Sequence, residues 1–424
     1  MKNLDDEMTR LYSLRRFGIK QGLSRITGLL EEMGNPHLEY NVVHVGGTNG
    51  KGSVCRILGS ILEEAGYITG VYTSPHLSHL RERIVVNDME INDDELYRLI
   101  EEVLSLVEKS RDKPTFFEVT TAIAFEYFRR KKVDVAVVEV GLGGRLDATN
   151  VVQPQLTVLT SISIDHGNIL GGTIDKIAEE KAGILKEGVP LITSAREKAL
   201  DIVRGVAKEK NVDVTVVDKN SWRRLEKNDN GQRFVVHGLI KDYDVETSLL
   251  GLYQGENVAV AVTSAEKLQM NGFFLPEGSI ERGVMLAENP GRMEVVSNNP
   301  TMVLDGAHNP AAMNALVETL LNDFEYNRLI VVLGMLGDKD VNSMVKTIAK
   351  HSSHIIATQP KNERACNANL IAEYIRKDKA GCKVEVIPNV EDAVKRVKKV
   401  AQGDDLVCIT GSLYTVGEAR DVLF

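Results

Sequence analysis

The segment from Val42 to Ser53, VVHVGGTNGKGS, brings together the residue types that bind phosphate. A short apolar run leads into four glycines within seven residues, with Lys51 among them and Ser53 directly after. The residues that follow have the apolar period of an amphipathic helix. A strand, a glycine-rich turn and a helix N-terminus direct backbone N–H groups at an anion, and a lysine adds positive charge. The segment therefore predicts a turn that binds phosphate.

This turn departs from the usual phosphate-loop spacing at two positions. Val45 stands where the pattern has its first glycine, and Gly52 separates Lys51 from Ser53. Glycine-rich turns without any chemistry are common, so the turn alone leaves a purely structural role open. Its neighbours in the fold have to decide between the two interpretations.

Three further apolar runs end in polar residues that could bind a metal or a nucleotide. Glu139 lies near the end of one run, Asp165 and His166 end the next, and Asp305 ends a third with His308 close behind. In open parallel sheets ligands collect at the carboxyl ends of the strands, so we expect these residues near the turn. The Glu139 carboxylate suits Mg²⁺, whereas His166 fits a metal ligand or a hydrogen-bonding residue equally, because histidine seldom binds Mg²⁺.

Lys181 lies on the apolar face of a predicted helix. In TIDKIAEEKAGILKEG, that face consists of Ile174, Ile177, Ala178 and Leu185. An unpaired ammonium group buried there is unfavourable, so the lysine must reach solvent, find a partner or be chemically altered. The sequence leaves these three possibilities open.

The composition indicates a globular protein with two domains. Its 424 residues exceed the size of one ordinary core. The formal net charge of −9 argues against non-specific nucleic-acid binding. No apolar run reaches the ~18 residues of a membrane span, and the N-terminus lacks the apolar core of a signal peptide. The four cysteines lie far apart without a CxxC pair, which favours reduced thiols in a cytoplasmic protein over a zinc site.

Strand-like and helix-like segments alternate along most of the chain, which predicts an α/β fold with mainly parallel sheets. The clearest strands are expected near residues 42–45, 133–140, 156–164 and 189–193. Between residues 211 and 250, the short runs VDVTVV and RFVVHGLI and the turn-like NDNG predict a small antiparallel piece. The Pro-, Gly- and Asn-rich stretch from 288 to 300 predicts a domain boundary, which divides the chain into residues 1–295 and 296–424.

Taken together, the motifs resemble the folylpolyglutamate synthase/dihydrofolate synthase family of the Mur ligase superfamily. The resemblance rests, in chain order, on GIKQGLSRI, HVGGTNGKGSV, VYTSPHLSHLRERI, FFEVTT, VEVGLGGRLDATN, SISIDH, IAEEKAGILK, LLGLYQGENVAVA, NPGRMEV, VLDGAHNP, GDKD and TGSLYTVGEAR. It implies a P-loop ATPase domain with a mainly parallel sheet and a small antiparallel piece. A smaller Rossmann-like C-terminal domain would follow, and it would be the glutamate-ligase domain.

The resemblance also implies a set of ATP-binding and metal-binding residues. The ATP-binding residues would be Thr48, Asn49, Gly50, Lys51, Gly52, Ser53, Gln254, Asn257, Arg292, Asp305 and His308. The magnesium ligands, directly or through water, would be Ser53, Ser74, Glu139 and His166. One departure is Tyr253, where the family commonly has histidine, which puts that contact to the nucleotide in doubt.

Further roles implied by the resemblance concern catalysis and the acceptor. The residues implied to take part in catalysis are Lys51, Lys181, Arg292 and His308. Lys181 matches a lysine that is carbamylated in the family, which would turn a buried cation into an anion. The pterin substrate would lie against Thr73, Ser74, Pro75, His76, Phe116, Phe117 and Glu118.

The expected reaction is the ligation of L-glutamate to dihydropteroate or a reduced folate. ATP would drive the reaction, with two Mg²⁺ ions as cofactors. The γ-phosphate would pass to the acceptor carboxylate, and the amino group of glutamate would attack the resulting acyl phosphate. We expect a cytoplasmic monomer without nucleic-acid or membrane partners. Two alternatives stay open: a Mur-type ligase acting on a UDP-linked peptidoglycan precursor, and a nucleotide-hydrolysing switch or binding protein. The first is disfavoured because only about 46 residues precede the turn, too few for a UDP-binding domain.

Overall fold

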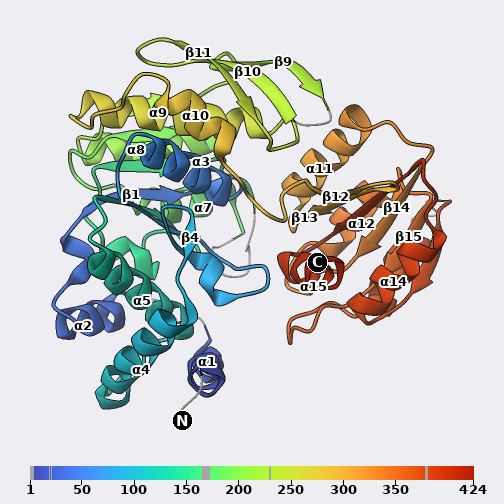
Figure 1. The fold of residues 1–424 in the computed structure, drawn as a ribbon, viewed down its shortest axis with the longest axis horizontal. Helices are drawn as coiled ribbons and strands as arrows, with labels where there is room; N and C mark the ends of the chain where they lie inside the picture. The colour runs from blue at the N-terminus through green and yellow to red at the C-terminus, as the bar shows by residue number, and fades with distance from the viewer. Residues whose placement is uncertain (1–3, 19, 21, 165–171, 229–230, 378–380) are drawn as a thin grey trace.

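Two mainly parallel sheets, each covered by helices on both faces, form the two halves of the chain (Figure 1). The computed structural model describes residues 4–18, 20, 22–164, 172–228, 231–377 and 381–424. The α/β class and the mainly parallel first sheet predicted from the sequence are confirmed.

The first sheet has eight strands that pair in parallel, except at one edge, where β3 pairs antiparallel with both of its neighbours. Its order is β4 (Met89–Glu90), β3 (Ile84–Val86), β2 (Thr69–Tyr72), β5 (Val135–Glu139), β1 (Asn41–Gly46), β6 (Leu156–Leu159), β7 (Leu191–Thr193) and β8 (Val214–Val216). Its helices are α1 (Leu4–Ser13), α2 (Ser24–Glu32), α3 (Lys51–Glu64), α4 (Asp93–Lys109), α5 (Phe116–Lys131), α7 (Ile174–Ala182), α8 (Glu197–Glu209), α9 (Gln254–Met270) and α10 (Ser279–Leu286).

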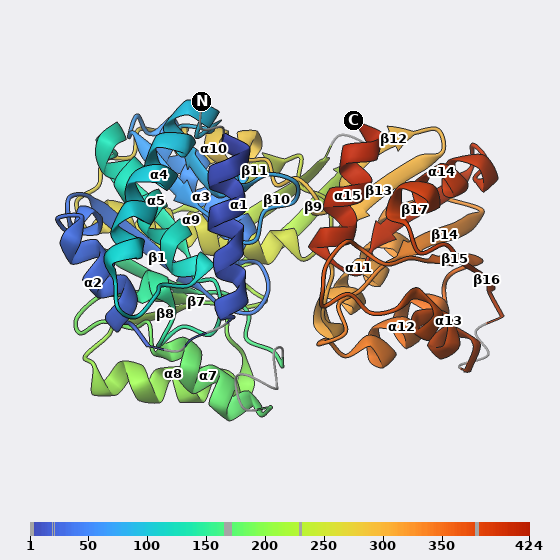
Figure 2. The same ribbon diagram turned by 90° about the horizontal axis from the view of Figure 1, so that it is seen from below.

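The central strands of this sheet are apolar on both faces. In β1, Val43 and Val45 pack with α3, α9 and α10, whereas Val42 packs with α1, α2, α4 and α5 on the other face (Figures 1 and 2). Strand β5 alternates in the same way, with Val137 on the first face and Val138 on the second. Burial on both faces explains why these strands are near-continuous apolar runs in the sequence.

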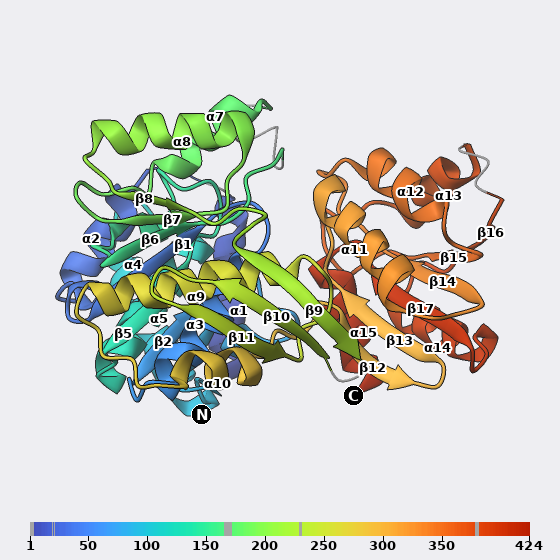
Figure 3. The same cartoon turned by 90° about the horizontal axis from the view of Figure 1, so that it is seen from above.

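A three-stranded antiparallel sheet lies against α9 (Figure 3). Its order is β11 (Asp242–Thr247), β10 (Gly231–His237) and β9 (Trp222–Asn228). The predicted antiparallel piece is therefore present, but VDVTVV was wrongly included in it. This run forms β8, which pairs in parallel with β7 after the α8 crossover and so ends the first sheet. The tip of the predicted NDNG turn lies outside the described residues.

The second half of the chain is a doubly wound six-stranded sheet. Its order is β12 (Glu294–Asn298), β13 (Thr301–Asp305), β17 (Asp405–Thr410), β14 (Arg328–Leu333), β15 (His354–Ala357) and β16 (Lys383–Val386). Helices on one face are α11 (Pro310–Asp323), α12 (Val341–Ala349) and α13 (Ala368–Lys377), and on the other α14 (Val390–Val400) and α15 (Leu413–Leu423). The expected boundary between residues 295 and 296 falls inside β12, so we propose that the domains divide just before Glu294.

Side chains of the two halves also contact each other outside the connecting segment. Strand β9 reaches α11 of the second half, where the Arg224 guanidinium lies 2.8 Å from a carboxylate oxygen of Asp323 (Figures 1 and 3). The Ser78 hydroxyl donates a 2.6 Å hydrogen bond to Asp421 on α15. Helices of membrane-spanning length and apolarity do not occur among the described residues. All four cysteines are free thiols.

A glycine at the contact between α3 and α10 gives a test of this packing. A Cβ on Gly283 would lie 2.4 Å from Ile61 Cα, so Gly283→Ala must push two helices apart. We expect it to lower the free energy of unfolding by about 1–3 kcal/mol. Thermal and urea unfolding measure the effect. Gly205→Ala in α8 is the matched control, because no heavy atom lies within 4 Å of its added methyl group. It should stabilise by about 0.5–1 kcal/mol, and a Gly283→Ala protein as stable as this control would contradict the packing.

Candidate active site

The turn between β1 and α3 has the shape expected of an anion-binding loop. Gly47 and Gly50 have φ angles of 136° and 89°, which side-chain-bearing residues rarely adopt. Helix α3 begins at Lys51, and its N-cap residue Gly50 has no side chain to accept the first N–H groups. The geometry therefore leaves the helix N-terminus to a ligand rather than to a capping residue.

A second loop, which follows β6, holds this turn in place. The Thr48 N–H donates to the Ser161 carbonyl over 2.7 Å, and the Thr48 hydroxyl donates to the Ser163 carbonyl over 3.1 Å. The Ser161 hydroxyl in turn donates to the Asn49 carbonyl over 3.2 Å. This loop thus satisfies three polar groups of the turn: the Thr48 N–H, the Thr48 hydroxyl and the Asn49 carbonyl.

Lys51, at the start of α3, faces Glu139, at the end of β5. The Lys51 ammonium lies 3.1 Å from the Thr48 carbonyl and 3.9 Å from a Glu139 oxygen. The other Glu139 oxygen accepts the Ser74 N–H over 2.9 Å. Burial raises the pKa of Glu139, while Lys51, the Ser74 N–H, Arg292 and Arg83 act against that rise. The carboxylate is therefore surrounded by cationic groups and a backbone donor from the first half and from the segment that connects the two halves.

The oxygen atoms at this place fit a hard divalent cation. Ser53, Ser74 and Glu139 offer hydroxyl and carboxylate oxygens, which Mg²⁺ prefers. The Ser53 hydroxyl accepts a 2.9 Å hydrogen bond from Asn289, which the sequence analysis did not single out. Among the described residues no three His, Cys, Asp or Glu side chains cluster as a ready-made metal site. The predicted ligand His166 lies outside the described residues.

Lys181 lies beside the same turn. Its side chain is buried, and its ammonium donates a 2.6 Å hydrogen bond to the Gly47 carbonyl. Of the three possibilities left by the sequence, the structure therefore shows pairing. The partner is a backbone oxygen of the anion-binding turn, so the lysine is close enough to influence any charge bound there.

Gln254 and Asn257, at the start of α9, lie on the other side of the turn. The Asn257 amide donates to Gln254 over 2.7 Å. The Gln254 side-chain NH₂ group is fully buried and has no hydrogen-bond partner among the described residues. Because a buried donor without a partner is costly, this group points to a ligand that accepts its hydrogen bond.

The second half of the chain contributes a buried carboxylate. Asp305, at the end of β13, accepts the N–H groups of Met293 and Ala307 over 3.0 and 2.9 Å and faces the Tyr253 hydroxyl at 3.4 Å. Burial raises the pKa of Asp305, and the nearby Arg292 opposes the rise. The tyrosine that replaces the expected histidine thus contacts Asp305 across the two halves. His308, three residues on, lies with its Nδ1 atom 2.9 Å from the Gly306 carbonyl.

Asn309 brings the second half directly to the anion-binding turn. Its side chain exchanges two hydrogen bonds with that of Asn49, at 3.3 and 2.9 Å. It also caps α11 by accepting the Ala312 N–H. The sequence analysis did not single out Asn309 for this role, although it directly follows His308 in the motif DGAHNP.

Most of the predicted acceptor residues lie together beside Glu139. We call the loop from Thr73 to His76 with the rings of Phe116 and Phe117 the acceptor wall; the two rings are its aromatic part. The Arg83 Nε atom donates a 3.0 Å hydrogen bond to His76 Nδ1, and the Arg83 guanidinium lies 5.5 Å from the Phe116 ring centre. The Thr73 N–H donates to the Arg83 carbonyl, and Ser74 and Pro75 follow in the same loop. Burial and nearby cations lower the pKa of His76 to about 3, so this histidine is neutral at pH 7.

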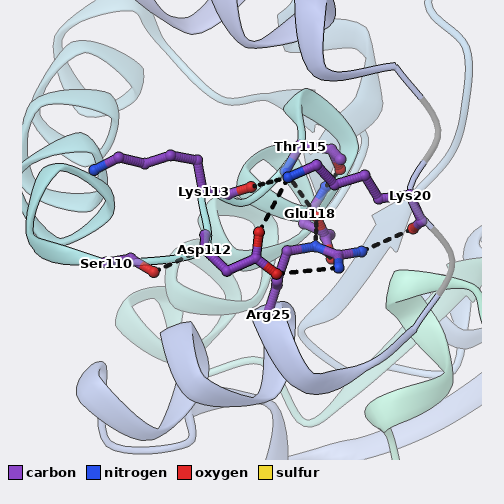
Figure 4. Close-up of polar contacts among 7 residues, drawn as sticks. All are labelled: Lys20, Arg25, Ser110, Asp112, Lys113, Thr115 and Glu118. Atoms are coloured by element: carbon purple, nitrogen blue, oxygen red, sulfur yellow. Dashed lines mark hydrogen bonds and ion pairs between the residues drawn. The ribbon is translucent and has the colours of Figure 1, made fainter.

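Phe117 and Glu118 point to different sides of α5. The Phe117 ring packs near Tyr72 and fills the space beside Gly141, where a Cβ would lie 2.3 Å from its Cζ atom. Glu118 instead accepts the Thr115 N–H over 2.7 Å and lies 3.1 Å from Arg25 (Figure 4). The structure therefore brings Phe116 and Phe117 together with the loop from Thr73 to His76, while the Glu118 carboxylate is engaged elsewhere.

Comparison with known proteins assigns both halves of the chain. Residues 45–265 match the Mur ligase middle domain, and residues 291–413 match the Mur ligase glutamate ligase domain. The dihydrofolate synthase/folylpolyglutamate synthase of Bacillus subtilis is 37% identical, with 98% of each chain covered. The chain belongs to the folylpolyglutamate synthase/dihydrofolate synthase family of Mur ligases. It is accordingly an ATP-dependent ligase.

Solved structures of relatives extend this likeness to the whole fold. An Escherichia coli relative solved with DHPP and ADP has a TM-score of 0.89 and 29% identity, covering 100% of this chain and 98% of its own. A bifunctional folylpolyglutamate synthase/dihydrofolate synthase with Mn, AMPPNP and L-glutamate bound has a TM-score of 0.86 and 28% identity, with coverage of 100% and 98%. The chain spans only about half of one relative, a probable bifunctional folylpolyglutamate synthase/dihydropteroate synthase of Halobacterium salinarum, at 40% identity over 98% of this chain and 51% of that protein.

The buried His76 in the acceptor wall predicts how the stability of the folded chain depends on pH. The pKa of His76 is about 3 in the folded chain and 6.5 when exposed, so only the unfolded state takes up its proton between these values. Stability from this residue is therefore lost as the pH falls below about 6.5. Between pH 7.5 and 5.0 we expect wild type to lose about 2 kcal/mol more than His76→Gln, whose amide oxygen still accepts from Arg83.

Urea unfolding at the two pH values measures this difference, with His351→Gln, at an exposed position, as the control. If the stability of His76→Gln falls with pH as steeply as that of wild type, His76 does not stay neutral in the folded chain.

Proposed function

We propose that this ligase joins the amino group of L-glutamate to the carboxylate of a pterin-containing acceptor, dihydropteroate or a reduced folate, through an acyl phosphate. One observation carries the proposal. The anion-binding turn, the Glu139 carboxylate and an aromatic wall from α5 converge from the first domain, and Asn309 and Asp305 meet them from the second. The relatives' bound DHPP, nucleotide, manganese and L-glutamate support this choice of substrates.

In this proposal the phosphates of ATP lie at the N-terminus of α3. The amides of residues 48–53 and the Lys51 ammonium bind them, and the unpartnered amide of Gln254, with Asn257, faces the base. A divalent cation between ATP and the oxygens of Ser53, Ser74 and Glu139 would stabilise charge on the phosphoryl group in transfer. The relatives' manganese supports one such ion, and we propose two Mg²⁺ ions with His166 as a further ligand.

The second domain completes the site from the opposite side. Asp305 and His308 lie at the carboxyl end of β13, near Arg292 of the connecting segment, and we propose that all three contact the nucleotide and the phosphoryl group. The hydrogen bonds between Asn49 and Asn309 support a closed arrangement of the two domains. Closure would keep water away from an acyl phosphate until the amino group of glutamate attacks it and phosphate leaves.

We also propose that Lys181 is carbamylated. Its amine would add to CO₂ with loss of one proton, which would give a carbamate anion beside the metal-binding oxygens. The burial of Lys181 next to Gly47 supports this. A short movement of the side chain away from the Gly47 carbonyl would bring the carbamate to face the bound cations. We further propose that the protein acts as a monomer in the cytoplasm, where its four free thiols stay reduced.

A ligation assay followed by mass spectrometry tests the proposed function. The purified protein is given ATP, Mg²⁺ and L-glutamate with dihydropteroate, a folate monoglutamate or a UDP-linked peptidoglycan precursor. The expected result is a glutamyl adduct of a pterin acceptor formed only with ATP. Glutamate-independent ATP hydrolysis without any amide product, or an adduct of the UDP-linked precursor alone, would refute the proposal.

The close approach at Gly50 predicts a selective loss of nucleotide binding. In Gly50→Ala, the methyl group would lie 2.3 Å from Asn257 Oδ1 at a φ of +89°, so the turn must deform. We expect the affinity for an ATP analogue to fall at least about tenfold. Gly66→Ala is the matched control, because its φ is +94° with nothing within 4 Å. Both variants should lose about 1–2 kcal/mol of stability from the backbone. Titration calorimetry measures the affinity for the nucleotide. If both variants bind the nucleotide equally well, the turn is not part of the nucleotide site.

Carbamylation predicts a chemical rescue. Lys181→Ala should lower ligation at least about tenfold, and short carboxylates such as acetate should restore part of it by replacing the lost anion. Lys176→Ala, on the exposed face of the same helix, serves as the control and should ligate like wild type. Full activity of Lys181→Ala without added carboxylate would exclude a carbamate role.

A further inference from the structure

Arg25, near the start of α2, contacts three separate segments through its one guanidinium group (Figure 4). Its Nε atom lies 3.1 Å from Glu118 on α5, and its Nη2 atom donates a 2.8 Å hydrogen bond to the Lys20 carbonyl. Its Nη1 atom lies 3.4 Å from Asp112, in the loop between α4 and α5. The Arg25 side chain is only 8% exposed, so its contacts are largely out of water except the one with Asp112, which is 62% exposed.

The contact with Glu118 reaches the first turn of α5. Glu118 is the third residue of this helix and forms a capping box with Thr115. The Glu118 carboxylate accepts the Thr115 N–H, and the Thr115 hydroxyl accepts the Glu118 N–H. A capping box fixes how the chain enters a helix. Because the same Glu118 carboxylate also faces Arg25, the entry of α5 is tied to α2 and to the segment before it.

The two residues inside this capping box are the aromatic residues of the proposed acceptor wall. Phe116 stacks on Tyr12 at a ring-centre distance of 5.5 Å and faces the Arg83 that orients His76. Phe117 packs against Gly141, two residues beyond Glu139. A small shift of the first turn of α5 would therefore move the acceptor wall while leaving the anion-binding turn in place.

The Arg25–Glu118 pair differs from the ion pair beside it. Both of its side chains are buried, at 8% and 5% exposure, and loss of one partner would leave the other charge without compensation. The Lys20–Asp112 pair is 33% and 62% exposed, so solvent screens it. Arg25 also lines a cavity of about 230 Å³, which gives water room to enter when the side chain is shortened. A lysine at this position cannot reproduce the three-way contact, because it lacks the guanidinium fork.

We propose that Arg25 is a positioning residue for the acceptor, acting through Glu118 and the first turn of α5 to place Phe116 and Phe117. This inference rests on the proposed function, since it assumes that the acceptor lies against these rings. It assigns a role to Arg25 and Glu118 that requires neither residue to touch the acceptor, ATP or glutamate.

Steady-state kinetics of Arg25→Gln test the proposal. We expect the KM for the pterin acceptor to rise at least about tenfold, the KM for ATP to stay within about twofold, and kcat to change less than about threefold. Arg25→Lys should lie between wild type and Arg25→Gln. If Arg25→Gln fails to fold, Arg25→Lys carries the same comparison, with a smaller rise in acceptor KM expected.

A double-mutant cycle shows whether Arg25 acts through Glu118. Glu118→Gln keeps the capping box but removes the charge, and it should also raise the acceptor KM. The double variant should be no worse than Arg25→Gln, because both changes break one connection. Arg328→Gln is the matched control for the loss of an arginine from a buried carboxylate: its partner Asp405 is 1% exposed and lies in the second domain. Its acceptor KM should equal that of wild type.

Two results would overturn the inference. One is a folded Arg25→Gln protein with wild-type acceptor KM, and the other is a parallel rise of the KM values for acceptor and ATP, which signals a general structural defect. Wild-type protein that ligates glutamate to none of the pterin acceptors would instead refute the proposed function, so the two failures are distinguishable.

Discussion

The close approach of surrounding groups to the backbone of residues 46–50 is the constraint on which the site depends. A Cβ on Gly47 would lie 1.9 Å from the Thr160 hydroxyl, and one on Gly50 would lie 2.3 Å from Asn257. Neither position therefore has room for a side chain, and both have φ angles that favour glycine. Because β1, the loop after β6 and the start of α9 all meet here, the bare backbone lets these three elements approach one another closely at the turn.

Burial of charge around this backbone sets the second requirement. Lys181 is buried and donates to the Gly47 carbonyl, while Glu139 accepts the Ser74 N–H and faces Lys51. Burial raises the pKa of Glu139, so the neighbouring cations and the backbone donor decide how readily it carries a negative charge. A bound nucleotide and divalent cation would change those surroundings, which couples ligand binding to the charge state of the site.

The sequence was sufficient wherever function depends on local backbone chemistry. The glycine turn, the strand ends at Glu139 and Asp305 and the apolar stripe that places Lys181 follow from spacing and have the expected positions in the fold, whereas the predicted strand end at Asp165 and His166 lies outside the described residues. The sequence was insufficient where a side chain's partner comes from a distant segment. Glu118 lies in the predicted acceptor motif, yet its carboxylate faces Arg25, some ninety positions earlier. The strand β8 was misassigned for the same reason, because its alternating pattern does not reveal which sheet it joins.

The division of the site between two domains suits the chemistry of a ligase. The first domain holds the anion-binding turn and the aromatic wall, whereas Asp305, His308 and Asn309 come from the second. Asn49 with Asn309 and Tyr253 with Asp305 are polar contacts across the division near the turn, whereas Arg224 with Asp323 and Ser78 with Asp421 lie away from it. The two hydrogen bonds between Asn49 and Asn309 join uncharged side chains, and such bonds contribute only about 0.5–1.5 kcal/mol each, so this contact at the turn is weak enough to break when products leave. A ligase that must both exclude water from an acyl phosphate and release a product of similar size needs a closure that is specific in geometry and modest in energy.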